Sequence, residues 1–487
     1  MTNTNIMKSI LQKYEPIIGL EIHAQLKTKT KMFCACSTEV NKEPNSLICP
    51  VCSGQPGSLP VVNKEAILMA IKTGLALNCS IYKKSIFARK NYFYPDLTKG
   101  YQISQHEYPI CTGGYVKICS DNKIEKISLI RIHLEEDAGK LTHDHGHVDK
   151  SHVDFNRCST PLIEIVSSPD IRSPKQGGDY LRTLRNILVY LDVCDGNLEE
   201  GNFRCDANVS IRLIGEKKFG IRTEIKNLNS FKAVEKALSF EIMRQAALLD
   251  SGKTNTQETR LWNDAKNETI SMRSKEEAHD YRYFPDPDLL PLILKESWIT
   301  KIKESLPELA DTKAERFVKE YGIPEYDARV LTDDKKLADY YEKCISIYNE
   351  PKKISNWIMT ELLRELKSDE RDLNECPISP DNMANLIKLI DNDTISGKIA
   401  KDVFQEMYAT GKPPDEIIKS KGLTQVSDIT LIEKVADQVI SANNKQVEQY
   451  KNGKQSLLGF FVGQVMKETK GKANPGIVND VLKKKLG

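Results

Sequence analysis

The stretch GLEIHAQL at residues 19–26 decides the fold class of the first part of this 487-residue chain. Alternate residues of a β-strand lie on opposite faces of a sheet. One face of this stretch is polar and consists of Glu21, His23 and Gln25. The other face is apolar and consists of Leu20, Ile22, Ala24 and Leu26. Residues 204–212 and 219–226 repeat the alternation. The pattern predicts a sheet with one apolar and one polar face.

The polar faces of these predicted strands combine chemically different groups. The second strand contributes Arg204, Asp206, Asn208, Ser210 and Arg212, and the third contributes Arg222, Glu224 and Lys226. One interpretation is a face in contact with water, which is the common arrangement. The other is a site for a divalent metal ion and phosphates, because carboxylates bind Mg²⁺ and cationic groups neutralise phosphoryl oxygens. Residues 131–137, RIHLEED, add further acids where a strand ends.

The character of the chain changes near residue 290. Before it, strand-like stretches at residues 17–26, 115–119, 127–134, 204–213 and 219–226 occur with helical patterns at residues 64–77, 178–191 and 233–249. After it, apolar residues recur at helical spacing. A further break falls at GKPP, residues 411–414, which cannot continue a helix. We therefore predict an α+β domain at residues 1–295, a helical domain at 296–412 and a small helical tail at 413–487.

Four cysteines form a CxC pair and a CPxC pair, at Cys34, Cys36, Cys49 and Cys52. Two closely spaced thiol pairs on turns can converge into a tetrahedral zinc site. The alternative is four buried thiols that cluster without metal. A site with four protein ligands has no open position, so the zinc would be structural.

Composition and charge exclude several classes of protein. The chain has 70 Lys and Arg against 68 Asp and Glu, and a net charge of +2, which gives no global argument for a nucleic-acid partner. Residues 443–487, however, hold nine lysines and three acids, which indicates a basic end that is either solvated or contacts phosphates. No apolar stretch is long enough for a membrane helix, and Met1 to Glu15 lack the apolar core of an export signal. We expect a cytoplasmic protein with reduced thiols.

A set of ordered motifs then makes the chain recognisable. They are GLEIHAQL (19–26), CSGQPGSLPVVN (52–63), RKNYFYPDLTKGYQISQ (89–105), HLEEDAGK (133–140), PLIEIVSSPDIRSP (161–174), LEEGNFRCDANVSI (198–211), EIKNLNSF (224–231), DYRYFPDPDL (280–289) and KNGKQSLLGFFVGQVMK (451–467). Together they closely resemble the GatB family, the B subunits of aspartyl/glutamyl-tRNA amidotransferases. The resemblance extends from about residue 15 to the end of the chain.

The resemblance implies a glutamine-synthetase-like antiparallel-sheet cradle, a helical domain and a tail that binds tRNA. It implies that ATP activates the side-chain carboxylate of Glu on mischarged Glu-tRNA(Gln), or of Asp on Asp-tRNA(Asn), as an acyl phosphate. Ammonia then displaces phosphate to form the amide. The ammonia comes from a partner amidase A subunit, and a small C subunit joins the two. This division of work agrees with the sequence, in which no Ser, Cys or His can be assigned as a nucleophile.

The resemblance also implies the site residues. The catalytic and Mg²⁺-binding set is Glu21, His23, Glu136 and Asp206. Strict alternation would place Glu135 rather than Glu136 on the face of His133, but the family motif favours Glu136. Phosphate or tRNA-terminus contacts are expected from Arg89, Lys90, Arg204 and Lys226.

Two other functions compete with this one. The chain could be a non-enzymatic, zinc-containing scaffold that binds tRNA through its basic end, in which case Glu21, His23 and Asp206 would be dispensable. It could also be a free-standing glutamine-synthetase-like ligase that acts on a small acid. The choice between Glu-tRNA(Gln) and Asp-tRNA(Asn) as substrate stays open, because it depends on the synthetases of the cell.

Overall fold

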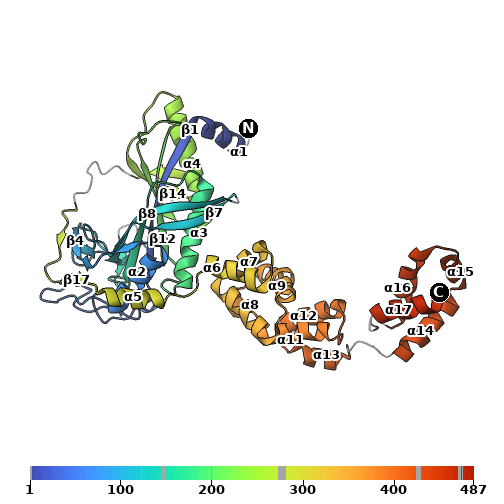
Figure 1. Cartoon of the computed structure of the whole chain (residues 1–487). Helices are drawn as coiled ribbons and strands as arrows, with labels where there is room; N and C mark the ends of the chain where they lie inside the picture. Colours follow the sequence, from blue (N-terminus) through green and yellow to red (C-terminus); the bar gives the residue numbers. More distant parts are fainter. Residues whose placement is uncertain are drawn as a thin grey trace. The chain divides into compact units, whose positions relative to one another are not determined.

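The computed structural model describes residues 3–121, 123–143, 150–198, 200–272, 281–423, 429–469, 473 and 475–487. The chain forms two compact units, Met1–Leu309 and Ala310–Gly487. The first is built on a large sheet with helices, which confirms the predicted α+β class, and the second is helical (Figure 1). In the part of the chain that the structure describes, no helix is both long and apolar enough to cross a bilayer.

The large sheet of the first unit has the strand order β15-β14-β13-β12-β1-β11-β8-β6-β2, and β7 pairs with β8. All neighbours are antiparallel except β13 and β14. Its strands are β1 (Tyr14–Gln25), β2 (Ser80–Ile81), β6 (Cys111–Thr112), β7 (Tyr115–Ser120), β8 (Lys123–Glu136), β11 (Pro161–Ser167), β12 (Phe203–Leu213), β13 (Thr223–Leu228), β14 (Glu258–Asn263) and β15 (Glu268–Ser271). The opening motif thus lies in β1, at the centre of the sheet.

Three helices cover the apolar face of this sheet. They are α2 (Lys64–Ala76), α3 (Pro174–Tyr190) and α4 (Phe231–Asp250) (Figure 1). Each begins where a polar side chain caps free backbone N–H groups, namely Asn63, Ser173 and Ser230. Their apolar residues share one core with the alternate residues of β1, including Leu20, Ile22 and Ala24. The polar residues of the same strands therefore lie on the other face.

Shorter elements complete the first unit. Small sheets pair β4 (Ala88–Asn91) with β5 (Tyr101–Ser104) and β16 (Phe284–Pro285), β3 (Lys84–Ser85) with β17 (Leu292–Ile293), and β9 (Lys140–His143) with β10 (Ser151–Asp154). Helices α1 (Asn3–Lys13) and α5 (Glu296–Glu304) flank the fold. Ile299 and Ile302 of α5 belong to the first core, so packing continues past the boundary expected at residue 295.

One predicted strand was wrong in its limits. Residues 219–226 were expected to form a strand, but β13 begins only at Thr223. Gly220 passes so close to the backbone of Ile211 that a Cβ would lie 2.2 Å from the carbonyl oxygen. The carbonyl of Ile221 accepts a hydrogen bond from the Asn255 side chain instead of pairing in the sheet. Alternation alone did not reveal these two local contacts.

The second unit contains two separate apolar cores. The first is formed by helices α6 (Ala310–Arg316), α7 (Glu325–Thr332), α8 (Lys335–Ile347), α9 (Pro351–Trp357), α10 (Leu363–Ser368), α11 (Pro380–Asp391), α12 (Gly397–Thr410) and α13 (Pro414–Lys421). Ile417 and Ile418 of α13 belong to this core, although they follow the boundary expected at residue 413. The second core is formed by α14 (Ile429–Ala442), α15 (Asn444–Lys451), α16 (Leu458–Glu468) and α17 (Pro475–Leu486).

Candidate active site and candidate zinc centre

The polar face of the sheet is organised by the register of four neighbouring strands. His23 of β1 lies opposite Glu164 of β11 on one side and Arg204 of β12 on the other. Glu164 in turn lies opposite His133 of β8. Because cross-strand partners are close neighbours, residues far apart in the sequence form one continuous polar row.

The centre of this row is a cluster of two histidines and two carboxylates. The Nε2 atom of His23 lies 3.3 Å from a Glu164 oxygen and 3.4 Å from a Glu135 oxygen. The Nε2 atom of His133 lies 3.3 Å from the same Glu164 oxygen. Candidate ligand atoms of His23, Glu135 and Glu164 all lie within 4.8 Å of one another, so these residues can hold a metal ion. Two carboxylates and one imidazole suit Mg²⁺ or Mn²⁺, which prefer oxygen ligands.

The electrostatics of this cluster favour charged groups. Burial lowers the pKa of His23, but the hydrogen bond to Glu164 and the charge of Glu135 outweigh it and raise that pKa. The same carboxylates raise the pKa of His133 to about 9 in spite of its burial. Burial would raise the pKa of Glu164, yet the charge of His133 and the hydrogen bonds from both histidines hold it well below its usual range. Glu164 is therefore a buried, ionised carboxylate.

A second group of polar residues lies beside the first on β1, β12 and β13. Glu21 is in register with Asp206, and its carboxylate accepts a hydrogen bond of 2.9 Å from Asn208. The Nζ atom of Lys226 lies 2.9 Å from Asp206 and 3.0 Å from Glu224. Burial raises the pKa of Glu21, and the charges of Glu164, Glu224 and Asp206 raise it further. Several acids thus surround a single cation, Lys226. A second, bound cation would reduce the repulsion among their negative charges.

The structure brings Glu135, and not Glu136, together with His23. The Glu136 side chain lies on the other side of β8, where one of its oxygens is 2.6 Å from Nζ of Lys99 and the carboxylate accepts the backbone N–H of Ile103. Strand alternation holds to the last residue of β8, which ends at Glu136. Glu135 and Glu136 thus face opposite sides of β8, as strict alternation predicts.

The four expected phosphate or tRNA contacts lie in different surroundings. Arg204 pairs with Asp137 at 2.9 Å, and Lys226 is held by Asp206 and Glu224. Arg89 pairs with Asp286 and Asp288, each at 2.8 Å, and stacks over the Tyr101 ring. The Nζ atom of Lys90 lies 4.7 Å from the centre of the Tyr281 ring. Burial lowers the pKa of Lys90, but nearby negative charges, above all that of Glu135, outweigh burial and raise this pKa. Lys90, Arg204 and Lys226 thus adjoin the polar row, whereas Arg89 is bound into its own ion-pair group.

Sequence reasoning missed Glu164 and gave His133 no role. Glu164 lies in PLIEIVS, a strand whose other members are apolar or small on both faces, so no alternation was visible. A single acid in such a strand is itself a signal, because an unpaired buried carboxylate is costly and requires partners. His133 is two residues before Glu135, and their shared face was readable from alternation.

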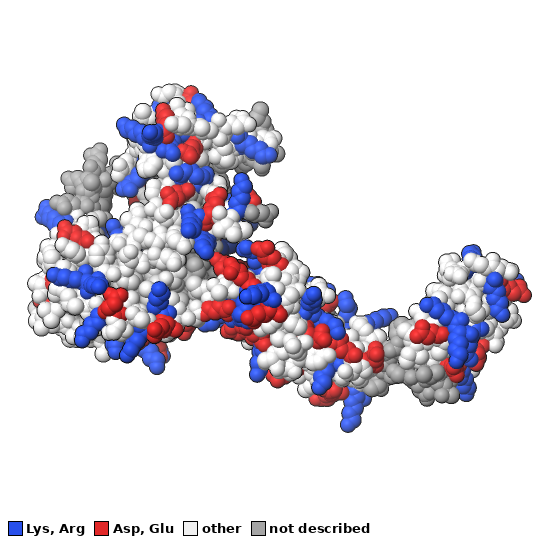
Figure 2. Space-filling model, viewed as in Figure 1, with Lys and Arg blue, Asp and Glu red and all other residues white. Residues whose placement is uncertain are grey.

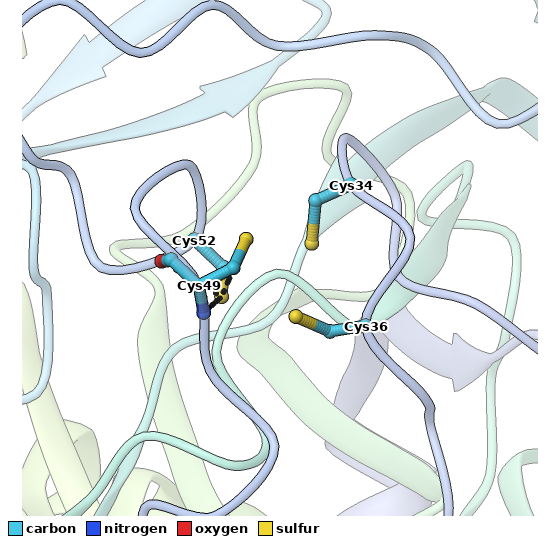
Figure 3. Close-up of side chains that lie close together, drawn as sticks. All are labelled: Cys34, Cys36, Cys49 and Cys52. Carbon is cyan, nitrogen blue, oxygen red and sulfur yellow. Dashed lines mark hydrogen bonds between the residues drawn. The ribbon is translucent and has the colours of Figure 1, made fainter.

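The four predicted zinc ligands converge in space. Figure 3 shows the side chains of Cys34, Cys36, Cys49 and Cys52 directed toward a common centre, and their sulfur atoms all lie within 4.8 Å of one another. The sulfurs of Cys49 and Cys52 are 3.8 Å apart. A tetrahedron with Zn–S bonds of about 2.3 Å has edges of about 3.8 Å, so this pair is already spaced for zinc. Hydrogen bonds from Cys34 and the Cys49 N–H and the charge of Lys31 lower the pKa of Cys52 to about 4.

Removing two thiols tests the zinc centre. We expect the Cys34→Ser, Cys36→Ser double variant to lose bound zinc and to unfold at a lower temperature than the parent, because structural zinc contributes folding free energy. Metal analysis and thermal unfolding of the purified chain measure both effects. Cys119→Ser, at an exposed position on β7, is the matched control and should change neither. Equal metal content in the double variant and the parent would contradict the assignment.

The fold and the site together define the class of this protein. It is an α+β protein whose large sheet carries a carboxylate–histidine cluster and whose first unit holds a four-thiol centre. The family model described as GatB/GatE catalytic domain matches residues 16–300, and the model described as GatB domain matches residues 339–486. The chain therefore belongs to the GatB family, which confirms the resemblance.

Known relatives match the chain over almost its whole length. It is 56% identical over 474 residues to the B subunit of the aspartyl/glutamyl-tRNA(Asn/Gln) amidotransferase of Thermodesulfovibrio yellowstonii, covering 97% of this chain and 99% of that protein. The protein of the same name from Syntrophotalea carbinolica is also 56% identical, with the same coverage. That of Carboxydothermus hydrogenoformans is 53% identical over 479 residues, or 98% of this chain and 99% of the relative.

Proposed function

We propose that this chain is the subunit of a tRNA-dependent amidotransferase that activates Glu on Glu-tRNA(Gln), Asp on Asp-tRNA(Asn), or both. ATP phosphorylates the side-chain carboxylate, and ammonia then displaces the phosphate to form Gln-tRNA(Gln) or Asn-tRNA(Asn). The names of the relatives support the tRNA substrates. The observation that carries the chemistry is the cluster of His23, Glu135 and Glu164.

The chemistry requires a leaving group and compensation of negative charge. A carboxylate is a poor electrophile, and phosphorylation converts one of its oxygens into a leaving group. When bound, Mg²⁺ would neutralise phosphoryl oxygens and orient them. His23, Glu135 and Glu164 would hold one such ion, and Glu21 and Asp206 lie in the adjoining group. Lys226, ion-paired with Asp206, supplies a cation on the same face.

The ammonia must be produced elsewhere. Among the described residues, the cysteines outside the four-thiol centre include several buried groups, and burial raises the pKa of Cys79 to about 12 and that of Cys111 well above its ordinary value. Such thiols are inert. We therefore propose that an amidase A subunit produces the ammonia and that a small C subunit completes the complex. This agrees with the relatives, each of which is named as one subunit.

We also propose finer assignments for the parts of the chain. The first unit would be a glutamine-synthetase-like cradle whose polar face receives ATP and the aminoacyl end of the tRNA. Lys90 and Arg204 would contact phosphate or the tRNA end, because both adjoin the carboxylate row. Glu136 keeps its expected place at the end of β8, but as the partner of Lys99 it would support the site rather than bind metal. The four-thiol centre would hold structural zinc.

The tail would contribute to tRNA binding. In the view of Figure 2, several Lys or Arg side chains gather on the bundle of α14–α17. Its exposed lysines include Lys445, Lys451, Lys454, Lys467, Lys483 and Lys484, while Lys470 and Lys472 lie outside the described residues. Lysines on phosphates release condensed counterions, which makes binding depend on salt.

Removing the tail should weaken tRNA binding. We expect a chain that ends at Leu423, which keeps the first helical core intact, to show a higher KM for charged tRNA. The slope of log affinity against log salt should fall by about one for each phosphate that the tail no longer neutralises. Steady-state kinetics and salt-dependent binding measure the two effects. An unchanged salt slope would leave the tail without a role in nucleic-acid binding.

Reconstitution tests the whole proposal. The chain, combined with the A and C subunits, is assayed for phosphate release from ATP with Glu-tRNA(Gln), with Asp-tRNA(Asn) and with free glutamate. We expect release with at least one charged tRNA and background release with free glutamate. Equal release with free glutamate would identify a small-acid ligase instead. Binding of tRNA without phosphate release in any arm would identify a scaffold.

A further inference from the structure

A buried lysine lies against the four-thiol centre. The Lys31 residue is 0% exposed, and its ammonium nitrogen is 3.6 Å from the Cys52 sulfur. It also donates to the backbone carbonyls of Leu47 at 2.8 Å and Phe155 at 3.4 Å. In the described parts of the chain, no carboxylate lies within ion-pair distance of this nitrogen. Burying a cation without an opposite charge is strongly unfavourable, so Lys31 requires an anionic neighbour.

A zinc ion with four thiolates supplies that neighbour. Four thiolate charges and one Zn²⁺ leave a net charge of −2 on the centre, which is also costly to bury. We propose that Lys31 is the counter-charge of this centre and that its ammonium ties the centre to the segment that follows β10. The proposal rests on the zinc assignment above. It adds that the positive charge of Lys31 lowers the cost of burying a centre with a net charge of −2.

The contacts around Lys31 show what the centre would hold in place. Besides Lys31, Cys52 connects the centre to two further segments, because its backbone carbonyl accepts from the Thr98 hydroxyl at 2.9 Å and from the Cys158 thiol at 3.4 Å. The residue after Thr98 is Lys99, the partner of Glu136. The residue before Cys158 is Arg157, whose guanidinium lies 3.5 Å from Asp137. The centre therefore borders the two segments that pair with the carboxylates at the end of β8.

Zinc affinity tests the counter-charge. Lys31→Met keeps most of the length of the side chain but removes its charge, and we expect it to weaken zinc binding by about 10–100-fold, the scale typical of residues that support metal ligands. Affinity is measured on the full-length chain by competition with a chelator of known strength. Substitution by Co²⁺ gives a thiolate absorption band that shows whether all four sulfurs still bind. Lys29→Met, at an exposed position two residues away, is the matched control and should bind zinc like the parent.

Stability with and without zinc separates the counter-charge from a merely structural role. If Lys31 only donates hydrogen bonds to Leu47 and Phe155, Lys31→Met lowers the stability of the zinc-free and the zinc-bound chain equally. If it compensates charge, the zinc-bound chain loses more, because ligand affinity and stability are linked. Lys31→Arg, which keeps the charge, should restore part of the affinity. In backbone hydrogen exchange, zinc should protect Thr98 and Phe155 less in Lys31→Met than in the parent.

The inference would be overturned by a zinc affinity in Lys31→Met equal to that of the parent, or by equal losses of stability in the two metal states. These measurements use neither ATP nor tRNA, so they stand apart from the assays of the amidotransferase. A parent chain that binds no zinc would refute the counter-charge and leave the proposed activity untouched.

Discussion

Replacing His23 with alanine should abolish tRNA-dependent phosphate release from ATP while tRNA binding persists. The His23 ring lies between the carboxylates of Glu135 and Glu164, so its loss removes one of the three candidate metal ligands. Removing one preorganised electrostatic group from an active site typically costs about 10²–10³-fold in kcat, and a loss at least that large is expected here. Phosphate release by the reconstituted complex and a tRNA binding assay measure the two halves of the prediction.

The matched control for this variant is His152→Ala. His152 is an exposed histidine on β10, so the His152→Ala variant should release phosphate as fast as the parent does. Normal turnover in His23→Ala would exclude the cluster from catalysis and would favour the scaffold function. Loss of both turnover and tRNA binding would indicate a folding defect, which circular dichroism of the variant would reveal.

The second large effect distinguishes the three acids around β8 and β11. We expect Glu135→Gln and Glu164→Gln to raise the Mg²⁺ concentration needed for half-maximal phosphate release and to lower kcat/KM by about 10²-fold, because each replaces a charged ligand with a neutral amide. Glu136→Gln should leave the Mg²⁺ requirement unchanged. It should instead lower the free energy of unfolding by about 3–5 kcal/mol, because Lys99 loses the carboxylate that pairs with it in a buried position.

Two measurements on the same proteins check this contrast. A Mg²⁺ titration of phosphate release compares the three variants with the parent, and denaturant unfolding compares their stabilities. The arrangement would be refuted by a Mg²⁺ requirement that rises in Glu136→Gln and stays constant in Glu135→Gln. That result would indicate that Glu136, which the family motif favours, binds the metal ion.

The charge composition of the chain is informative only when the basic C-terminal bundle is counted separately from the rest. A net charge of +2 gave no reason to expect nucleic acid, yet the exposed lysines of α14–α17 lie on one small bundle with its own core. The overall balance averages this bundle with a more acidic remainder. Local excess charge, rather than the total, decides whether a surface suits phosphates.

Much of the candidate site followed from strand alternation. The period of two predicts that Glu21, His23 and Gln25 share one face, and that Glu135 rather than Glu136 shares a face with His133. The four cysteines were equally readable, because short spacings bring thiols together whatever the rest of the chain does. These are local properties, set by backbone geometry within a few residues.

Other features depended on contacts between distant segments, and only the tertiary structure decided them. Glu164 binds both histidines because β11 lies between β1 and β8 in one particular register, and no property of PLIEIVS predicts that register. Glu136 pairs with Lys99 and lies away from His23, and Lys31 lies against Cys52 because distant loops fold together. The sequence by itself determined which groups share a strand face. Which groups meet across strands was decided by the packing of the whole sheet.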